Sequence, residues 1–168
     1  MVVSCGAKCK VVKWKECKIT DVKKASGIIF TGSPTMFTEV SANPYIKKFS
    51  FIKAGKIPVL GICFGHQLMG IIYGAKIFRG EEIRTKNKIS VLKKDILFEN
   101  LFPETEMGED HTEGITLPPE FIHLATSDSY IVEGMRHRVF PLWGVQFHPE
   151  ISGKNGKVLF GNFLSCCK

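Results

Sequence analysis

The chain has 168 residues, 44% of them hydrophobic, and carries a net charge of +7 at neutral pH. This length and composition predict one folded domain, over residues 1–168, whose core needs no disulfide or metal for support. The sequence shows neither a secretion signal nor an apolar run of membrane-spanning length, so we expect a cytoplasmic protein without membrane contact.

Metal ions and nucleic acid are not expected as ligands. The six cysteines, at positions 5, 9, 17, 63, 166 and 167, lack the paired spacing of a zinc site. Seven lysines crowd between positions 8 and 24, but no nucleic-acid-binding motif accompanies them. We interpret this basic stretch as a solvated face or a docking surface for an acidic protein.

The N-terminal half alternates apolar runs with helical patterns. The expected elements are, in order, a strand over 10–14, a helix or turn over 19–25, a strand over 27–31, an amphipathic helix over 45–54 ending at Gly55, a buried strand over 57–60 and an apolar helix over 67–73. Strands that alternate with helices in this way predict a parallel sheet.

In the C-terminal half, the pattern of apolar residues changes. Residues 76–93 alternate apolar and polar side chains, which predicts short antiparallel strands. The expected inward positions are Ile77, Phe78, Ile83, Ile89, Val91 and Leu92. Further predicted elements are a turn or short helix over 97–101, a hairpin of 122–125 with 130–135, a strand over 142–147 and a last helix over 158–165.

Cys63 lies between Gly61 and Gly65, where the buried strand meets the apolar helix. A reactive side chain at so tight a turn needs glycine on both sides for close backbone approach. A thiol at a helix N-terminus also sits beside N–H donors and the positive end of the helix dipole, which favour a thiolate. The pattern indicates a cysteine nucleophile, with a buried structural cysteine as the alternative.

A cysteine nucleophile needs a base, and His148 is the best candidate among five histidines. It ends an apolar strand and is followed by Pro149, while Glu150 lies where a carboxylate could fix the imidazole tautomer. His66 lies three residues after Cys63 and is a rival base, which we interpret as structural because it would face sideways on a helix. His123 and His137 are expected to have no catalytic role.

Three segments together resemble the signatures of class I glutamine amidotransferases. They are Pro-Val-Leu-Gly-Ile-Cys-Phe-Gly-His-Gln over 58–67, Gly-Val-Gln-Phe-His-Pro-Glu over 144–150, and a turn Thr-Gly-Ser-Pro over 31–34. Residues 132–150 look most like the stand-alone glutaminase subunits of GMP synthetases. The resemblance implies an α/β fold in which a mostly parallel open sheet is flanked by helices, with a small antiparallel addition, as in flavodoxin-like proteins.

The resemblance also implies a catalytic triad of Cys63, His148 and Glu150 that hydrolyses glutamine through a γ-glutamyl thioester. An oxyanion site would lie between the N–H of Phe64 and the turn at Gly32 and Ser33. The expected glutamine-binding side chains are Gln67, Asp110 and His111. No cofactor is expected in this chain: ATP and Mg²⁺ would serve a partner, an ATP-pyrophosphatase (synthetase) subunit that aminates XMP.

Three departures from the family pattern leave other functions open. Ser33 replaces a glycine, Asp110 precedes His111 where a Ser-His pair is usual, and the strand and helix that normally precede residue 10 are missing. The first two departures motivate a γ-glutamyl peptide hydrolase that acts alone. The third motivates a truncated, non-catalytic paralogue with an interaction role.

Overall fold

The computed structural model describes residues 2–55 and 57–167. The strands are β1 (Ile28–Phe30), β2 (Val59–Ile62), β3 (Ile77–Ile83), β4 (Lys86–Val91), β5 (Glu104–Gly108), β6 (His111–Ile115), β7 (Phe121–Thr126), β8 (Gly134–His137) and β9 (Leu142–Val145). The α-helices are α1 (Ile19–Lys23), α2 (Asn43–Phe49), α3 (Phe64–Ile72) and α4 (Gly153–Ser165), and the 3-10 helices are Val3–Cys5, Ser50–Ala54, Ile96–Phe98 and Pro149–Ile151.

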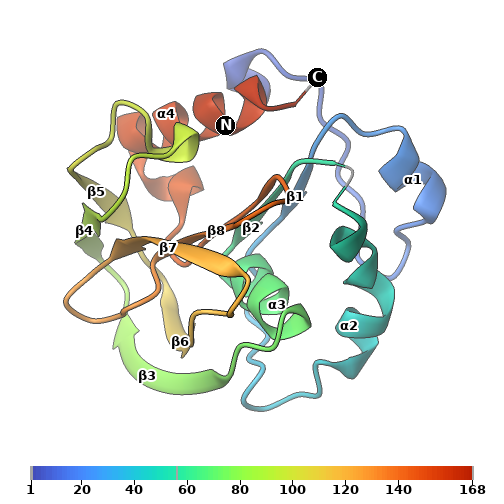
Figure 1. Ribbon diagram of the computed structural model, residues 1–168, viewed down its shortest axis with the longest axis horizontal. Coiled ribbons are helices and arrows are strands. Elements are labelled where there is room, and N and C mark those ends of the chain that lie inside the picture. Colours follow the sequence, from blue (N-terminus) through green and yellow to red (C-terminus); the bar gives the residue numbers. More distant parts are fainter. Residues whose placement is uncertain (1, 56, 168) are drawn as a thin grey trace.

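Seven strands form one sheet in the order β1-β2-β9-β8-β7-β4-β5, and β3 pairs with β6 in a separate two-stranded sheet. The α/β fold flanked by helices is confirmed (Figure 1). The expectation of a mostly parallel sheet is wrong, because only β1–β2 and β2–β9 are parallel pairs. The remaining pairs of the sheet are antiparallel, since the chain after α3 returns through hairpins rather than helical crossovers.

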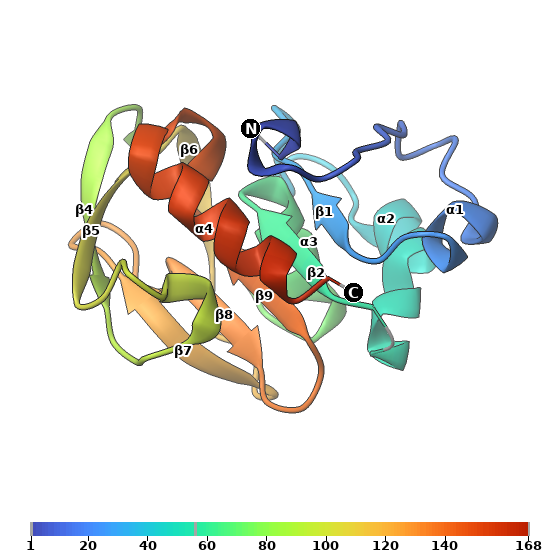
Figure 2. The same cartoon turned by 90° about the horizontal axis from the view of Figure 1, so that it is seen from above.

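The helices cover both faces of the large sheet. Val59 and Leu142 pack in the same core as residues of α2 and α3, whereas Leu60 and Val145 pack in a second core with α4. This follows from the alternation of side chains along each strand, which sends neighbouring residues to opposite faces. Figure 2 shows α4 crossing one face of the sheet while α2 and α3 lie on the other side.

Several N-terminal predictions hold and one fails. The strand at 27–31, the helix at 45–54 and the strand-to-helix turn at Cys63 are confirmed, although the 45–54 helix is split into α2 and a 3-10 turn. Residues 10–14 form no strand; they are irregular and then turn, and Val11 is 91% exposed. A run of lysines beside so little buried apolar surface does not stabilise a strand.

In the C-terminal half, α4 begins at Gly153, earlier than predicted, and the second hairpin strand begins only at Gly134. Phe78 and Leu92 were expected to point inward but are 41% and 47% exposed. β5 and β6 were not predicted, because their sequences, ETEMG and HTEGI, lack a continuous apolar pattern. They are strands because they complete two sheets with strands distant in sequence.

β1 has β2 as its strand partner among the described residues. The described residues before β1 form a 3-10 turn, irregular backbone and α1.

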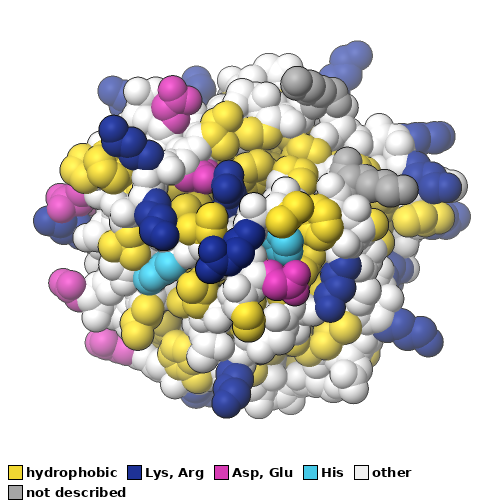
Figure 3. Space-filling view, in the orientation of Figure 1, with side chains coloured by type: hydrophobic (Ala, Val, Ile, Leu, Met, Phe, Trp, Pro, Cys, Tyr) yellow, Lys and Arg dark blue, Asp and Glu magenta, His cyan; other side chains and the backbone are white. Residues whose placement is uncertain are grey.

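No helix among the described residues is long and apolar enough to cross a membrane. Lys and Arg side chains are dispersed around the face seen in Figure 3 rather than gathered into one patch.

Because α3 packs closely against β1, we expect a side chain at Gly65 to destabilise the fold. A Cβ at Gly65 would lie 2.2 Å from the carbonyl oxygen of Phe30, so Gly65→Ala should lower the free energy of unfolding by about 1–3 kcal/mol or more through overpacking. Urea denaturation measures this change.

The matched control is Gly161, a glycine of α4 whose added Cβ would meet nothing within 4 Å. Gly161→Ala should raise the free energy of unfolding by about 0.5–1 kcal/mol, as alanine does in a helix interior. Equal effects of the two substitutions would show that the α3–β1 approach is looser than described.

Candidate active site

The site lies at the carboxyl ends of the three parallel strands. Gly32 follows β1 by two residues, Cys63 follows β2 directly, and His148 follows β9 by three. The register pairs Phe30 with Gly61 and Ile62 with Val145, so these strands end at one edge of the sheet. The three residues converge there: a Cβ on Gly32 would lie 2.8 Å from Cε1 of His148 and 3.7 Å from Cβ of Cys63.

Cys63 occupies a strained backbone conformation, with φ 47° and ψ −106°, as the N-cap of α3. Such a conformation is costly for a residue with a side chain and persists only where its surroundings enforce it. Two glycines make the turn possible: a Cβ on Gly61 would lie 2.6 Å from the carbonyl oxygen of Gly65, and Gly65 itself abuts Phe30. The predicted nucleophile elbow is therefore present, with the cysteine buried at its apex.

His148 and Glu150 form a hydrogen-bonded pair. Nδ1 of His148 donates to Oε1 of Glu150 over 2.7 Å. This bond leaves Nε2 for the thiol: Nε2 is buried and has no partner of hydrogen-bond geometry within the described residues, yet Cys63 is close enough to perturb the imidazole. Loose geometry between nucleophile and base is usual in a site without substrate.

The electrostatics of the pair favour an imidazolium. Burial by itself would lower the pKa of His148, but the interactions with Cys63 and Glu150 outweigh burial and raise that pKa to about 10. Burial would raise the pKa of Glu150, but its hydrogen bond with His148 lowers it. At neutral pH the site therefore holds a protonated His148 beside an ionised Glu150.

The turn expected to form part of an oxyanion site lies beside the cysteine, at Gly32. Ser33 needs no positive φ, because Cys63 and Asn100 are the only non-glycine residues in the described ranges with that conformation. Replacement of the family's glycine by Ser33 therefore causes no positive-φ strain. Its hydroxyl donates to Oγ1 of Thr35 and accepts from the N–H of Thr35, which closes a local turn. Phe64 is the first residue of α3, where backbone N–H groups point toward the helix N-terminus.

The three predicted glutamine-binding residues have different environments. Gln67 is buried, and its Nε2 donates to the carbonyl oxygen of Glu113 and to Oε1 of Gln146. His111 is also buried, with its ring bonded to Glu109 and to the backbone of Glu113. Asp110 is exposed and lies 3.6 Å from Arg84. The direct substrate contact of these residues stays a prediction.

His66, the rival base, is fully buried beneath β9, where a Cβ on Gly144 would lie 2.5 Å from its Nδ1. Burial lowers the pKa of His66 to about 3, so it is neutral at physiological pH. This environment suits a packing role and not a base exchanging protons with substrate. Neither His123 nor His137 lies in the pair with Cys63: both ring systems bond to backbone near their own strands.

Sequence reasoning missed two buried acids next to the site, Glu109 and Glu133. No motif marks them, because one lies in the β5–β6 turn and the other in the loop before β8. The available signal was an acidic residue within an apolar stretch, as in Ile-Val-Glu-Gly-Met. Buried carboxylates are rare enough to carry information.

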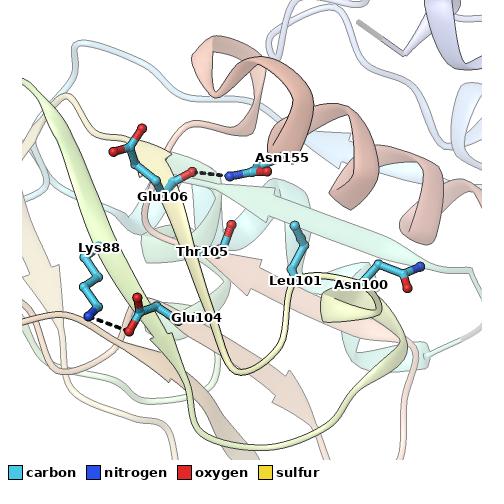
Figure 4. Close-up of a pocket in the computed structure, with 7 residues that line it drawn as sticks. All are labelled: Lys88, Asn100, Leu101, Glu104, Thr105, Glu106 and Asn155. Atoms are coloured by element: carbon cyan, nitrogen blue, oxygen red, sulfur yellow. Dashed lines mark hydrogen bonds and ion pairs between the residues drawn. The ribbon is translucent and has the colours of Figure 1, made fainter.

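A surface cavity of about 380 Å³ lies away from these residues, between β4, β5 and the start of α4 (Figure 4). Within its lining, Nζ of Lys88 is 2.6 Å from Glu104, and Asn155 donates to the backbone of Glu106. The residues that line it include none of the candidate catalytic groups. This cavity is not part of the candidate active site.

Comparison with known proteins agrees with the geometry. Residues 1–166 match the family model described as glutamine amidotransferase class-I. The chain is 34% identical over 154 residues to a Pyrococcus abyssi protein named as the A subunit of GMP synthase (glutamine-hydrolyzing), covering 89% of this chain and 80% of that protein. The protein of the same name from Methanococcoides burtonii is 36% identical over 149 residues, covering 87% of this chain and 76% of the relative.

Solved structures share the fold. A protein from Thermoplasma acidophilum, described as the putative A subunit of a GMP synthase, has a TM-score of 0.80 and 28% identity, covering 88% of this chain and 75% of that one. A glutamine amidotransferase from Thermotoga maritima has a TM-score of 0.69 and 19% identity, covering 95% of this chain and 67% of that one. The flavodoxin-like α/β arrangement expected from the sequence is therefore confirmed.

The raised pKa of His148 predicts a specific pH dependence. The folded pKa is about 10 against an ordinary value of 6.5, so the stability contributed by the imidazolium is full below pH 6.5 and is lost as pH rises through about 10. An NMR titration of the His148 ring should show a midpoint near 10. Glu150→Gln removes the partner charge and should lower that midpoint by about one unit or more.

Glu104→Gln is the matched control, because Glu104 is a surface carboxylate paired with Lys88 and not with His148. It should leave the His148 midpoint unchanged. A midpoint that is the same in wild type and Glu150→Gln would show that the 2.7 Å contact does not stabilise the imidazolium.

Proposed function

The chain belongs to the class I glutamine amidotransferase family, and from that premise we propose that it is the glutaminase subunit of a two-subunit GMP synthase. The observation that carries the proposal is the convergence of Gly32, strained Cys63 and the His148–Glu150 pair at one sheet edge. The names of its relatives support the GMP assignment, since they describe the A subunits of GMP synthases.

In the first half-reaction, Sγ of Cys63 attacks the side-chain carboxamide carbon of glutamine. In this proposal the nucleophile is the thiolate, and the protonated His148 balances its charge. The C–S bond forms, the carbonyl π electrons move onto oxygen, and a tetrahedral intermediate results. His148 then protonates the leaving nitrogen, the C–N bond breaks, and ammonia departs from a γ-glutamyl thioester.

The negative oxygen of that intermediate needs donors beside Cys63. Two backbone N–H groups serve: that of Phe64, at the start of α3, and one from the turn at Gly32 and Ser33. The helix dipole of α3 adds positive potential at the same point. Because these donors are backbone groups fixed by the elbow and the turn, they cost no reorganisation during the reaction.

In the second half-reaction, water hydrolyses the thioester. His148, now neutral, takes a proton from water, and hydroxide adds to the thioester carbon. The C–S bond then breaks, which regenerates the Cys63 thiolate beside a protonated His148, and the new carboxyl group loses its proton to solvent as glutamate leaves. Glu150 holds the imidazole in one orientation through both halves by accepting from Nδ1.

The ammonia is consumed by a separate subunit. We propose that this partner is the ATP-pyrophosphatase (synthetase) subunit, which binds ATP and Mg²⁺ and aminates XMP. The chain contributes no Gly-rich phosphate loop of its own to such a step. The seven lysines between residues 8 and 24 suit docking of an acidic partner surface.

Two observations support the glutaminase proposal over a γ-glutamyl peptide hydrolase that acts alone. Ser33 is unstrained and turns its hydroxyl onto Thr35. Asp110 is exposed, and its charge is offset by Arg84 at 3.6 Å. The elbow also persists intact, which argues against a non-catalytic paralogue.

The nucleophile assignment is tested by substitution. Cys63→Ser should reduce glutamate release from glutamine by about 10⁴-fold or more, because a seryl hydroxyl beside an imidazolium is a far weaker nucleophile than a thiolate. The assay measures glutamate with the chain alone and with a GMP synthase synthetase subunit, ATP and XMP added. Activity should rise when the partner and its substrates are present.

Cys9→Ser is the matched control, since Cys9 is exposed and unpaired with any residue of the site. It should retain full activity. Equal glutamate release by wild type and Cys63→Ser would contradict the thioester mechanism. Hydrolysis of glutamine that is unaffected by the synthetase, with no GMP formed, would contradict the GMP assignment alone.

The turn at Gly32 gives a second prediction. A Cβ there would lie 2.8 Å from Cε1 of His148, so Gly32→Ala should displace the imidazole and lower kcat by about 10²–10³-fold, the range for losing an oxyanion donor. Gly161→Ala, with open space around its Cβ, should leave kcat unchanged. An active Gly32→Ala enzyme would show that this turn does not touch the reacting groups.

A further inference from the structure

Three buried side chains meet beside the active site without a role in the proposed hydrolysis. Glu109 lies in the β5–β6 turn, His111 begins β6, and Glu133 precedes β8. One ligand-type atom from each lies within 4.8 Å of the other two. The relative exposures of the three residues are 2%, 7% and 0%. Two of the residues lie at or just before the start of a strand of the small sheet, and the third precedes a strand of the large sheet.

The hydrogen bonds of His111 fix the state of its ring. Nδ1 lies 3.2 Å from the carbonyl oxygen of Glu113, which can only accept, so Nδ1 carries a proton. A neutral imidazole then presents a bare lone pair at Nε2, and Nε2 is in contact with Oε2 of Glu109. Two lone pairs repel one another, so this contact requires a positive charge: a shared proton at the present separation, or a metal ion that the two atoms would move apart to bind. A ligating histidine typically donates its other N–H to a backbone carbonyl in this way.

The carboxylates present further unsatisfied oxygens. Oε1 of Glu109 and Oε2 of Glu133 are buried and have no hydrogen-bond partner in the ranges that the structure describes. The other oxygen of Glu133 accepts from Ser127 over 2.7 Å, which orients the carboxylate. Burying two unpaired carboxylate oxygens is unfavourable unless a proton or a metal ion compensates their charge.

We propose that Glu109, His111 and Glu133 bind one zinc ion. Two carboxylates balance its charge of two, and the neutral imidazole supplies the nitrogen ligand. Zinc accepts this nitrogen and oxygen set at about 2.0–2.2 Å, so Nε2 of His111 and Oε2 of Glu109 would move apart to admit the ion between them and Glu133. A fourth position remains for water or for a protein oxygen.

The ligand set argues against other cations. Ca²⁺ takes six to eight oxygens and Mg²⁺ keeps several waters, which a buried site with one imidazole does not offer. No cysteine belongs to the cluster, so a soft ion such as Cu(I) has no preferred ligand there. The sequence expectation of no metal site rested on cysteine spacing and did not consider these acids.

The remaining neighbours leave the ligand atoms free for the ion. The Tyr130 ring packs edge-on against His111, with 4.6 Å between centroids, while its hydroxyl donates to the backbone of Glu81. Tyr130 therefore lines one side of the cluster, and its hydroxyl is hydrogen-bonded outside the cluster.

The proposed ion would tie the small sheet to the large one. Its ligands come from the start of β6 and from the loop before β8, and Glu133 is held to the segment after β9 because its carbonyl accepts from the N–H of Gln146. Gln146 lies two residues before His148. The ion therefore has a structural role next to the catalytic strand, and it takes no part in attack on the substrate.

The test uses the full chain stripped with a chelator, dialysed, and then titrated with ZnCl₂. Equilibrium dialysis with metal analysis by plasma mass spectrometry should give one zinc per chain. Glu133→Gln and Glu109→Gln keep the side-chain shape and remove a charged ligand, so each should weaken zinc binding by more than about 100-fold, beyond the ~10–100-fold typical of losing an outer-shell partner. Cooperative melting of each variant verifies folding.

Glu106→Gln is the matched control, because Glu106 is a nearby surface acid on β5 paired with Lys86. It should bind zinc like the wild type. Cobalt(II) in place of zinc should give d–d absorption without the charge-transfer band of a thiolate ligand, and the wild-type melting temperature should rise with zinc while that of Glu133→Gln should not.

Three results would overturn the proposal. Zinc stoichiometry and melting shifts equal in wild type, Glu133→Gln and Glu109→Gln would show that the ion is not held by these acids. A cobalt–thiolate band would place the metal on cysteines. Absence of zinc binding by the folded wild type would leave a shared proton as the cation of the cluster. Each readout is independent of glutamine hydrolysis, so it separates this proposal from the proposed function.

Discussion

The backbone of Cys63 has a positive φ that residues with a side chain rarely adopt, and the surrounding structure holds it in that conformation. The φ of 47° requires a rigid strand on one side and a rigid helix on the other. β2 supplies the first as a buried strand paired on both sides, and α3 supplies the second by packing against β2. Gly61 and Gly65 let the two elements approach until a single Cβ would no longer fit. The strain is therefore offset by the core, and the thiol remains at the sheet edge.

The base is positioned by contacts with elements that carry no motif. The N–H of His148 donates to the carbonyl of Gly108 over 2.8 Å, and the hydroxyl of Ser152 donates to the carbonyl of His148. Ser152 in turn accepts from the N–H of Gly108, so β5, His148 and the start of α4 form one closed set of bonds. Gly156 completes the arrangement, since a Cβ there would lie 1.8 Å from the carbonyl of Pro149. Positioning of the imidazole thus depends on β5, an antiparallel strand at the opposite end of the strand order from β1.

Local pattern predicted the elbow, the His148–Glu150 pair and the parallel strands because each depends on residues close in sequence. Glycine on both sides of Cys63, and a carboxylate two residues after the histidine, are signals of that kind. β5 and β6 depend instead on partners distant in sequence, and a polar strand such as HTEGI carries no periodic signal. The sequence pattern did not predict the buried acids Glu109 and Glu133 for the same reason. Their significance exists only once two segments 24 positions apart are brought together by the sheets.

Gln67 links these parts and clarifies what the family motif does in this chain. The amide nitrogen of Gln67 donates to Glu113 on β6 and to Gln146 just after β9, so α3 is bonded to both sheets just behind the elbow. Both donor hydrogens of the Gln67 amide are therefore engaged, which leaves the side-chain carbonyl oxygen of Gln67 as its only free polar atom for a substrate contact.

Gln146 continues the chain of contacts by donating its backbone N–H to the carbonyl of Glu133. A buried polar network connects the nucleophile's helix to the acid cluster, and such networks confer precise positioning only when every member is satisfied. Oε1 of Glu109 and Oε2 of Glu133 have no hydrogen-bond partner in the described part of the chain, nor does Nε2 of Gln146, and the proposed cation would supply the positive charge that the two oxygens need.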